Sequence, residues 1–313
     1  MIAAVTGAGG FCGRHLVRHL EETGVEVHRL SARPDGGGAG ERVHVVDPAD
    51  ATVLAAALRS IQPDWIFHLA GLATGSDIAA YYRINVLYAA NLLQAAETAG
   101  LSDRPMLWVG TAAEYGRVDP TQLPVTESAP ARPLGHYGIS KLAQTHMGLA
   151  AARTGRPVII ARSSNIIGPG MPEHIAIQSF ARQIAAIAAG RQPPIIETGN
   201  LNSIRDFIDV ADVARLYVRL MQTPRARGEI VHVCTGEGTS VRDILERMIK
   251  RSGLTIELRL DPARLRALDV PVYIGSTAKL MDLLGEVRFT PLDETLDRIC
   301  QQDGAPWFHR CQP

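Results

Sequence analysis

The stretch Thr6-Gly7-Ala8-Gly9-Gly10-Phe11-Cys12-Gly13 lies between an apolar run over residues 2–6 and a helical pattern over residues 14–23. Gly7, Gly10 and Gly13 have the spacing Gly-x-x-Gly-x-x-Gly, which permits a tight turn and a close approach of the backbone to a pyrophosphate. The N–H groups and the dipole at the start of a helix attract such an anion. We therefore predict a dinucleotide-binding turn, with a tight turn that holds no ligand as the alternative.

Strands alternate with helices along the first half of the chain. Apolar runs predict strands over residues 2–6, 25–30, 43–46, 65–69, 106–109 and 158–161. Segments rich in Ala and Leu predict helices over residues 14–23, 52–60, 84–99 and 139–153. This alternation indicates βαβ units, and strands that are apolar throughout indicate a sheet covered on both faces. We predict an α/β fold with a doubly wound, Rossmann-type parallel sheet, and the glycine turn argues against a barrel.

The second half is less regular and predicts a smaller, interleaved α/β lobe that binds the substrate. Helices are predicted over residues 175–189, 210–221, 241–251 and 277–284. A strand over residues 230–234 is expected to return to the first sheet, and residues 255–260 to form part of a second sheet. The predicted dinucleotide-binding domain is 1–162 with about 207–235, and the predicted substrate lobe is about 163–206 with 236–313.

The composition excludes several classes of function. The chain has 313 residues, of which 46% are hydrophobic, and its 32 basic and 32 acidic side chains cancel. We therefore expect no nucleic-acid partner and no membrane association, since no apolar run reaches the length of a membrane span. The beginning of the chain lacks the charged leader of a signal peptide, and the cysteines form no CxxC pair. We expect a cytoplasmic protein without a metal site.

The end of the second predicted strand bears on the choice between NAD and NADP. An Asp or Glu at this place usually binds the ribose 2′-hydroxyl of NAD, but this strand ends Leu30-Ser31-Ala32-Arg33. Arg33 suits a 2′-phosphate, so we predict NADP, with NAD as the alternative cofactor and a solvent-facing role as the alternative for Arg33. Asp47 is placed to reach the adenine amino group or, alternatively, to cap the next helix.

A tyrosine and a lysine lie four residues apart in Tyr137-Gly138-Ile139-Ser140-Lys141, on one face of a predicted helix. A nearby ammonium lowers the pKa of a phenol, so we predict that Tyr137 exchanges a proton and that Lys141 tunes it and holds the nicotinamide ribose. Thr111 ends the preceding strand, where a parallel sheet presents its ligands, and is placed to polarise a carbonyl. A capping hydroxyl is the alternative for Thr111.

These motifs, together with His68-Leu69-Ala70, Asn85 and Tyr115-Gly116, resemble the extended short-chain dehydrogenases/reductases that act on nucleotide sugars. The resemblance covers nearly the whole chain. It implies the catalytic set Thr111, Tyr137 and Lys141. It also implies further contacts to the cofactor, from Phe11, Leu69, Ala70 and Asn85.

Residues 161–170, 203–210 and 261–270 resemble the members of this family that reduce a GDP-linked 4-keto-6-deoxyhexose. By this resemblance Asn165 contacts the substrate, Arg205 and Arg266 bind the diphosphate, and Asp269 binds the ribose hydroxyls. Two arginines suit a diphosphate because guanidinium groups pair bidentately with phosphate oxygens. Surface ion pairs are the alternative, since Arg205 adjoins Asp206 and Arg266 is near Asp269.

The resemblance implies NADPH-dependent reduction of GDP-4-keto-6-deoxy-D-mannose to a GDP-6-deoxyhexose such as GDP-D-rhamnose. The related dehydratases carry an acidic residue two places after the threonine, where this chain has Ala113, so dehydration is disfavoured. One alternative is an NAD(P)-dependent nucleotide-sugar epimerase. Another, of a different class, is a non-catalytic NADP-binding sensor, which would not need the Tyr137 proton donor.

The predicted helices 84–99 and 139–153 are rich in Ala and Leu. In the family that the chain resembles, the corresponding helices often pair two subunits into a four-helix bundle. We therefore expect a homodimer. The alternative is that these helices pack only within one chain.

Overall fold

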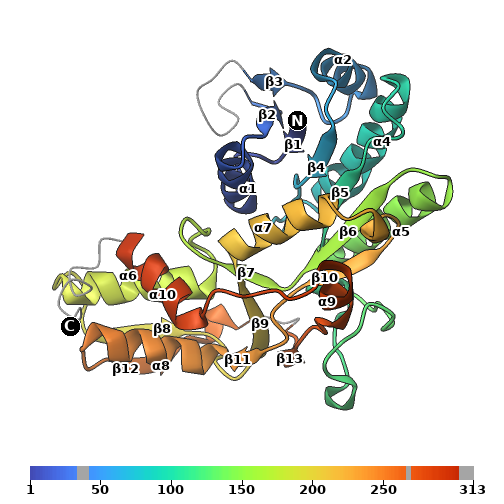
Figure 1. The fold of residues 1–313 in the computed structure, drawn as a ribbon. Coiled ribbons are helices and arrows are strands. Elements are labelled where there is room, and N and C mark those ends of the chain that lie inside the picture. Colours follow the sequence, from blue (N-terminus) through green and yellow to red (C-terminus); the bar gives the residue numbers. More distant parts are fainter. Residues whose placement is uncertain (34–41, 266–268, 303–313) are drawn as a thin grey trace.

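The computed structural model describes residues 1–33, 42–265 and 269–302, and it places them in two lobes (Figure 1). Among these residues, seven parallel strands form the sheet of the first lobe, in the order β10-β6-β5-β4-β1-β2-β3. The strands are β1 Ile2–Thr6, β2 Glu26–Ser31, β3 Val43–Val45, β4 Trp65–His68, β5 Met106–Thr111, β6 Val158–Ser163 and β10 Ile230–Val233. The predicted doubly wound, Rossmann-type sheet is confirmed.

The direction of winding reverses beside β1. β2 and β3 lie on one side of it, and β4, β5 and β6 lie on the other. The carboxyl end of β1 therefore opens into the crevice where sheets of this kind bind ligands. The glycine turn leaves the sheet at this point, and helix α1 (Phe11–Glu22) follows it with Gly10 as its N-cap.

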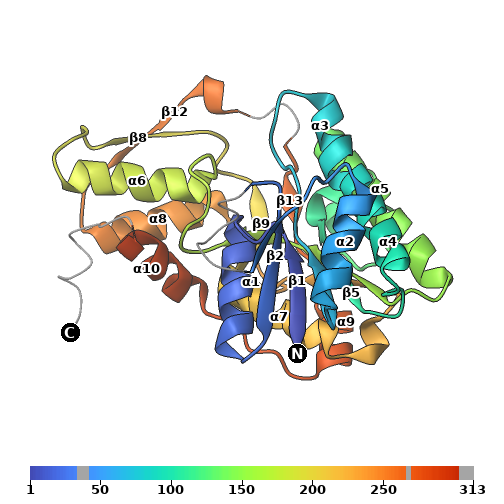
Figure 2. The ribbon, with the colours of Figure 1, turned by 90° about the horizontal axis from the view of Figure 1, so that it is seen from above.

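Helices cover both faces of the first sheet (Figure 2). On one face α1 packs against α7 (Val210–Met221), and α9 (Ala278–Leu284) contributes the buried Leu280. The opposite face is covered by α2 (Ala51–Ile61), α4 (Tyr88–Thr98) and α5 (His136–Arg153). Both faces of the strands are therefore buried, which explains why the strands are apolar at successive positions.

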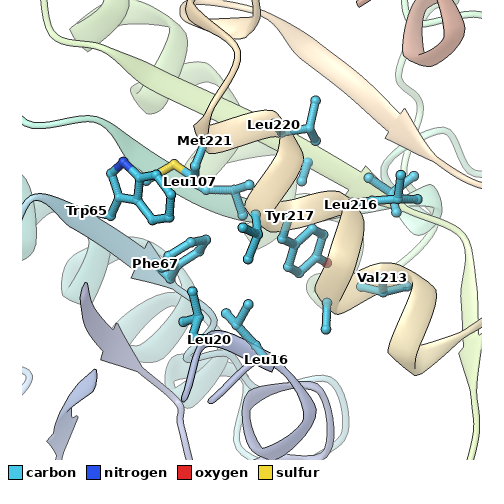
Figure 3. Close-up of a cluster of buried hydrophobic side chains, with 14 of the residues drawn as sticks. Leu16, Leu20, Trp65, Phe67, Leu107, Val213, Leu216, Tyr217, Leu220 and Met221 are labelled. Atoms are coloured by element: carbon cyan, nitrogen blue, oxygen red, sulfur yellow. The ribbon is translucent and has the colours of Figure 1, made fainter. Parts of the chain in front are cut away.

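A cluster of buried side chains fixes α7 to the sheet (Figure 3). Leu16 and Leu20 of α1, Phe67 of β4 and Tyr217 of α7 all lie in it and are fully buried. Each such side chain stabilises the fold by roughly 1.5–3 kcal/mol through removal of its apolar surface from water. Since α7 directly follows a strand of the second lobe, this cluster also anchors that lobe to the first.

The second lobe is smaller and is built around β9 (Ile204–Asp209). β9 pairs with β7 (Asn165–Ile167), β11 (Gly238–Ser240) and β13 (Val272–Tyr273). A separate parallel pair is formed by β8 (Ile195–Thr198) and β12 (Glu257–Leu260). An apolar cluster joins α6 (Ala176–Ala188), α8 (Val241–Ser252) and α10 (Leu292–Gln302).

Two helical regions differ from the sequence prediction. The predicted helix 84–99 begins earlier, at α3 (Ile78–Tyr82), because the Asp77 carboxylate caps it by accepting from the Ala79 N–H at 2.9 Å. It continues through a π-helical turn, Arg83–Leu87, into α4. The sequence does not predict α10, which is held by tertiary hydrogen bonds from Thr295 and Arg298 to one Asp209 oxygen, each of 2.8 Å.

The return of the chain from the second lobe to β10 agrees with the sequence prediction. The domain boundaries near residues 162, 207 and 235 stay a prediction. Within the described ranges, no helix combines the length and the apolar character needed to cross a bilayer.

Candidate active site

The glycine turn lies against the backbone of the loop that follows β4. Gly7 has φ +70°, and a Cβ atom there would lie 2.6 Å from the Ala70 backbone nitrogen. A Cβ atom on Gly13 would lie 2.1 Å from the Gly7 carbonyl oxygen. Any side chain at either position would therefore displace backbone. The turn keeps its N–H groups at the crevice only because these two residues are glycines.

A cavity of about 610 Å³ opens at this turn. It is lined by Gly7 to Gly10, by residues 30–33 at the end of β2, by Ala70 and Gly71, and by Ile84 and Tyr88. Arg33 is exposed at its edge, and the Arg33 N–H donates to the Ser31 hydroxyl oxygen at 3.1 Å. The cavity has the lining expected of a dinucleotide site, and Arg33 lies where a 2′-phosphate is predicted.

Other predicted cofactor residues are near this cavity but are engaged with the protein itself. Asp47 is exposed and accepts from the Ala49 N–H at 2.8 Å, whereas Asp50 is the N-cap of α2. The alternative role of Asp47 as the helix cap is therefore wrong. Phe11 packs its ring edge against His15 and contacts the apolar cluster of the second lobe. Leu69 contributes backbone that the Gly7 position approaches closely.

Asn85 is fully buried in the π-helical turn. Its amide exchanges two hydrogen bonds with the Leu72 backbone, of 2.8 and 3.0 Å, and donates to the Ser140 hydroxyl at 2.9 Å. Asn85 thus joins the loop beside the cofactor cavity to the helix that carries Tyr137 and Lys141. Direct contact between Asn85 and a cofactor stays a prediction.

Thr111 and Tyr137 meet at the carboxyl end of β5. Their side chains are hydrogen-bonded to each other, and Cys12 of the glycine turn is close enough to affect the ionisation of Tyr137. Burial raises the pKa of Tyr137 to about 12, and the hydrogen bond from Thr111 offsets only part of this effect. Thr111 also accepts from the Ala113 N–H at 3.3 Å, so it has the capping role that was its alternative, and its contact with a substrate carbonyl stays a prediction.

Lys141 is 4% exposed and donates to the Gln144 side-chain oxygen at 2.5 Å. Burial lowers the pKa of Lys141 to about 8, and the Glu114 carboxylate acts in the opposite direction. Burial raises the pKa of Tyr137 in this structure, and the lowering of that pKa by Lys141 stays a prediction. The role of Lys141 toward a cofactor stays a prediction.

Glu114 is a residue of this site that the sequence analysis missed. Its carboxylate is fully buried and accepts from the Thr111 N–H at 2.8 Å, from Arg162 at 2.6 Å and from the Thr145 hydroxyl at 2.9 Å. It thereby joins β5, β6 and α5. The signal was present in the sequence, since Thr111-Ala112-Ala113-Glu114 has the Thr-x-x-Glu spacing of a capping box.

The buried polar network continues from Arg162 to Tyr115 and His232. Arg162 donates to the Tyr115 hydroxyl at 2.7 Å, and the same hydroxyl lies 2.6 Å from His232 Nε2. Burial lowers the pKa of His232 to about 3, so the ring is neutral and its Nε2 shares one hydrogen bond with the Tyr115 hydroxyl. The buried ion pair of Glu114 with Arg162 thus connects Thr111 and Thr145 to Tyr115 and His232.

A second cavity, of about 370 Å³, lies in the smaller lobe and brings together predicted substrate residues from three segments. Asn165 of β7, Arg205 of β9 and Asp269 all line it. Arg205 donates to Asp269 at 2.8 Å, and Asn200 donates to the other oxygen of Asp269 at 2.6 Å. Arg205 therefore forms its ion pair with Asp269. The alternative, an ion pair with the adjacent Asp206, is wrong. Arg266 lies outside the described residues.

Asp206 is buried and serves a different purpose. Its carboxylate accepts from the Thr235 N–H and hydroxyl and from the Gly236 N–H, each at 2.9 Å. It joins β9 to the loop that follows β10. Within the described ranges no group of three or more metal-ligating side chains is found.

Comparison with known proteins places the chain in a family. Residues 3–234 match the model of the NAD dependent epimerase/dehydratase family. The chain belongs to this family. The family predicted from the glycine turn and from Tyr137 with Lys141 is thereby confirmed.

Relatives within the epimerase/dehydratase family have different activities. GDP-6-deoxy-D-mannose reductase of Pseudomonas aeruginosa is 34% identical over 286 residues, 90% of each chain. UDP-glucose 4-epimerase of Streptomyces lividans is 31% identical over 301 residues, 90% of this chain and 89% of its own. A solved structure of RMD from Pseudomonas aeruginosa, complexed with NADPH, has a TM-score of 0.86 at 30% identity and covers 99% of both chains.

The first prediction for this family member concerns the buried ion pair. Glu114→Gln should lower the free energy of unfolding by about 3–5 kcal/mol, because the Arg162 charge is left buried without its partner. Asp282→Asn is the matched control, since it breaks an ion pair with Arg225 in which both side chains are 66% exposed. It should cost about 1 kcal/mol or less. Urea unfolding measures both, and equal losses would contradict the assigned importance of Glu114.

The second prediction concerns the proton donor. Tyr137→Phe keeps the ring but removes the hydroxyl that Thr111 contacts, and it should lower kcat by about two to four orders of magnitude. Cofactor affinity, measured by fluorescence titration with NADPH, should hardly change. Near-normal turnover by this variant would show that another group supplies the proton.

Proposed function

We propose that this member of the epimerase/dehydratase family is an NADPH-dependent reductase of a nucleotide-linked 4-keto-6-deoxyhexose. The proposed substrate is GDP-4-keto-6-deoxy-D-mannose, and the product a GDP-6-deoxyhexose such as GDP-D-rhamnose. The observation that carries the proposal is the contact of Thr111 with Tyr137 near Cys12 of the glycine turn, in a chain that also has a dinucleotide cavity and an arginine-bearing cavity. The 34% identity to GDP-6-deoxy-D-mannose reductase supports the choice of sugar.

The raised pKa of Tyr137 suits the direction of reduction. With its pKa near 12, the phenol is protonated at neutral pH and is ready to donate. Bound NADPH supplies the hydride to the carbonyl carbon. Tyr137 gives its proton to the carbonyl oxygen, which becomes the new hydroxyl, while the Thr111 hydroxyl polarises the same oxygen. Lys141 holds the ribose beside this pair in the proposed complex.

NADP is proposed as the cofactor, with NAD as the alternative. Support comes from the cavity edge, where Ser31, Ala32 and Arg33 stand without a carboxylate that would repel a 2′-phosphate. The relative RMD was solved with NADPH. A reductase must exchange its nicotinamide at every turnover, and a cofactor cavity of this kind, open at its edge, is compatible with exchange.

Dehydration is disfavoured by the surroundings of Thr111. The two residues that follow it are Ala112 and Ala113, which offer no acid or base. Glu114 is acidic, but it is fully buried and its oxygens are held by Thr111, Thr145 and Arg162. It is therefore turned away from any sugar beside Tyr137.

Epimerisation is the second candidate function, because a UDP-glucose 4-epimerase is 31% identical over 90% of this chain. An epimerase oxidises and re-reduces the same sugar, so it needs the Tyr137 phenolate in one half of its cycle. An epimerase retains and recycles its cofactor, which favours NAD, whereas the end of β2 carries no Asp or Glu for the ribose 2′-hydroxyl. A non-catalytic sensor is disfavoured by the paired Thr111 and Tyr137, since cofactor binding alone does not need them.

We propose a homodimer in which the helical segments 84–99 and 139–153 of two chains pack against each other. Leu87 and Ile139 lie on these helical segments and are 55% and 40% exposed. Apolar side chains of this size at a helix surface are compatible with a partner helix. A cytoplasmic location is proposed together with this assembly.

The third prediction tests the reaction. Mixing NADPH, the protein and GDP-4-keto-6-deoxy-D-mannose should consume one NADPH per sugar, measured as loss of the reduced-nicotinamide absorbance. The sugar product should carry a new C4 hydroxyl, and GDP-mannose alone should give no dehydrated product. Tyr137→Phe is the control for adventitious reduction. Conversion of the sugar without net loss of NADPH would replace the reductase by the epimerase.

The fourth prediction tests the cofactor. Arg33→Ala should weaken NADPH binding roughly tenfold or more, the scale of one charge-assisted hydrogen bond, and leave NADH binding nearly unchanged. Titration of both cofactors against the wild type and the variant measures the difference. An equal effect on NADPH and NADH would remove Arg33 from the 2′-phosphate site.

A further inference from the structure

The cavity of the smaller lobe carries two charged side chains that the proposed reaction leaves without a role. Glu197, on β8, and Arg264, in the short helix Pro262–Arg264, both line it. Their charged groups lie 3.5 Å apart and are 52% and 42% exposed. Arg264 is held in turn by Asp261, whose carboxylate lies 3.2 Å from the Arg264 Nε atom. The cavity thus presents an accessible carboxylate beside an accessible guanidinium.

The chain is shaped to bring these two groups together. A Cβ atom on Gly199 would lie 2.6 Å from the Arg264 carbonyl oxygen, so a side chain there would push the Arg264 segment away from the end of β8. The Glu197 N–H also donates to the Gln183 side-chain oxygen at 3.2 Å, which fixes this part of β8 to α6. Backbone contacts therefore position both residues, Arg264 through its approach to Gly199 and Glu197 through its N–H to Gln183.

The same cavity holds the Arg205–Asp269 pair and the Glu197–Arg264 pair, and the chain limits how far apart they lie. Asn200 and Arg205 meet at Asp269, where the diphosphate and ribose are proposed to bind. Glu197 precedes Asn200 by three residues, so the two are separated by at most about 10 Å of extended chain. A base attached to that ribose would therefore lie near Glu197 and Arg264.

The hydrogen-bonding edges of the bases differ in a way that this pair distinguishes. Guanine presents two adjacent donors, N1–H and the N2 amino group, beside its O6 acceptor. Uracil and thymine present a single N–H between two carbonyl oxygens, and these oxygens repel a carboxylate. A carboxylate accepts from two adjacent donors bidentately, and a guanidinium donates to a carbonyl such as O6.

We infer that Glu197 selects the base of the substrate by accepting from guanine N1–H and N2–H₂, while Arg264 orients Glu197 and donates to O6. This inference rests on the proposed function, because it presumes a nucleoside diphosphate in this cavity. Glu173 lines the same cavity, but it pairs with Arg182 on α6 and has no part in the Glu197–Arg264 pair. It offers a matched control with the same change of charge.

Binding of free nucleotides tests this assignment without turnover. Dissociation constants of GDP, inosine diphosphate and UDP are measured by calorimetry for the wild type, Glu197→Gln and Glu173→Gln. Inosine diphosphate lacks only the N2 amino group. The wild type should bind GDP at least about tenfold more tightly than inosine diphosphate or UDP, the scale of one charge-assisted hydrogen bond.

Glu197→Gln should lose most of the preference for GDP over inosine diphosphate, and Glu173→Gln should keep it. Thermal melting of both variants checks that they are folded, which is expected because Glu197 is half exposed. If Glu197→Gln keeps the full preference, or if Glu173→Gln loses it equally, the assignment to Glu197 is wrong while the GDP-linked substrate stands. If the wild type prefers UDP, both the assignment and the proposed GDP-sugar fail.

Discussion

The Glu114 carboxylate is the interaction on which the arrangement of the candidate active site depends. Its two oxygens join the end of β5, through Thr111, to β6, through Arg162, and to α5, through Thr145. Tyr137 and Lys141 lie on the same helix as Thr145. Because the ion pair is sealed from water, each of these hydrogen bonds is costly to break. The position of Thr111 relative to Tyr137 follows from this network and not from local chain geometry alone.

The second constraint on the site is the close approach of backbone segments at glycine residues. Gly138 lies between Tyr137 and Lys141, and a Cβ atom there would lie 2.6 Å from the Ala113 carbonyl oxygen. A Cβ atom on Gly110 would lie 2.8 Å from a Glu114 oxygen. Helix α5 can therefore approach the end of β5 only where glycine leaves room. The same device, at Gly7 and Gly13, brings the dinucleotide turn against the loop after β4.

The chain leads from the end of β6 directly to a residue that lines the second cavity. Ser163 is the register partner of Thr111, and β7 begins two residues later at Asn165, which lines the second cavity. A stretch of three residues thus leads from the strand neighbour of Thr111 to the proposed nucleotide-sugar site.

Local sequence determined the first sheet, the glycine turn and the pairing of Tyr137 with Lys141 on one helix face, since these depend on residue types at short spacing. Asn165, Arg205 and Asp269 were also predicted, but only by resemblance, and their meeting in one cavity needed the folded chain. Only the tertiary structure decided that Arg205 pairs with Asp269 instead of its neighbour Asp206, and that α10 forms against Asp209. It also decided the state of Tyr137, because the pKa of a phenol depends on how completely the fold removes it from water, which no spacing in the sequence records.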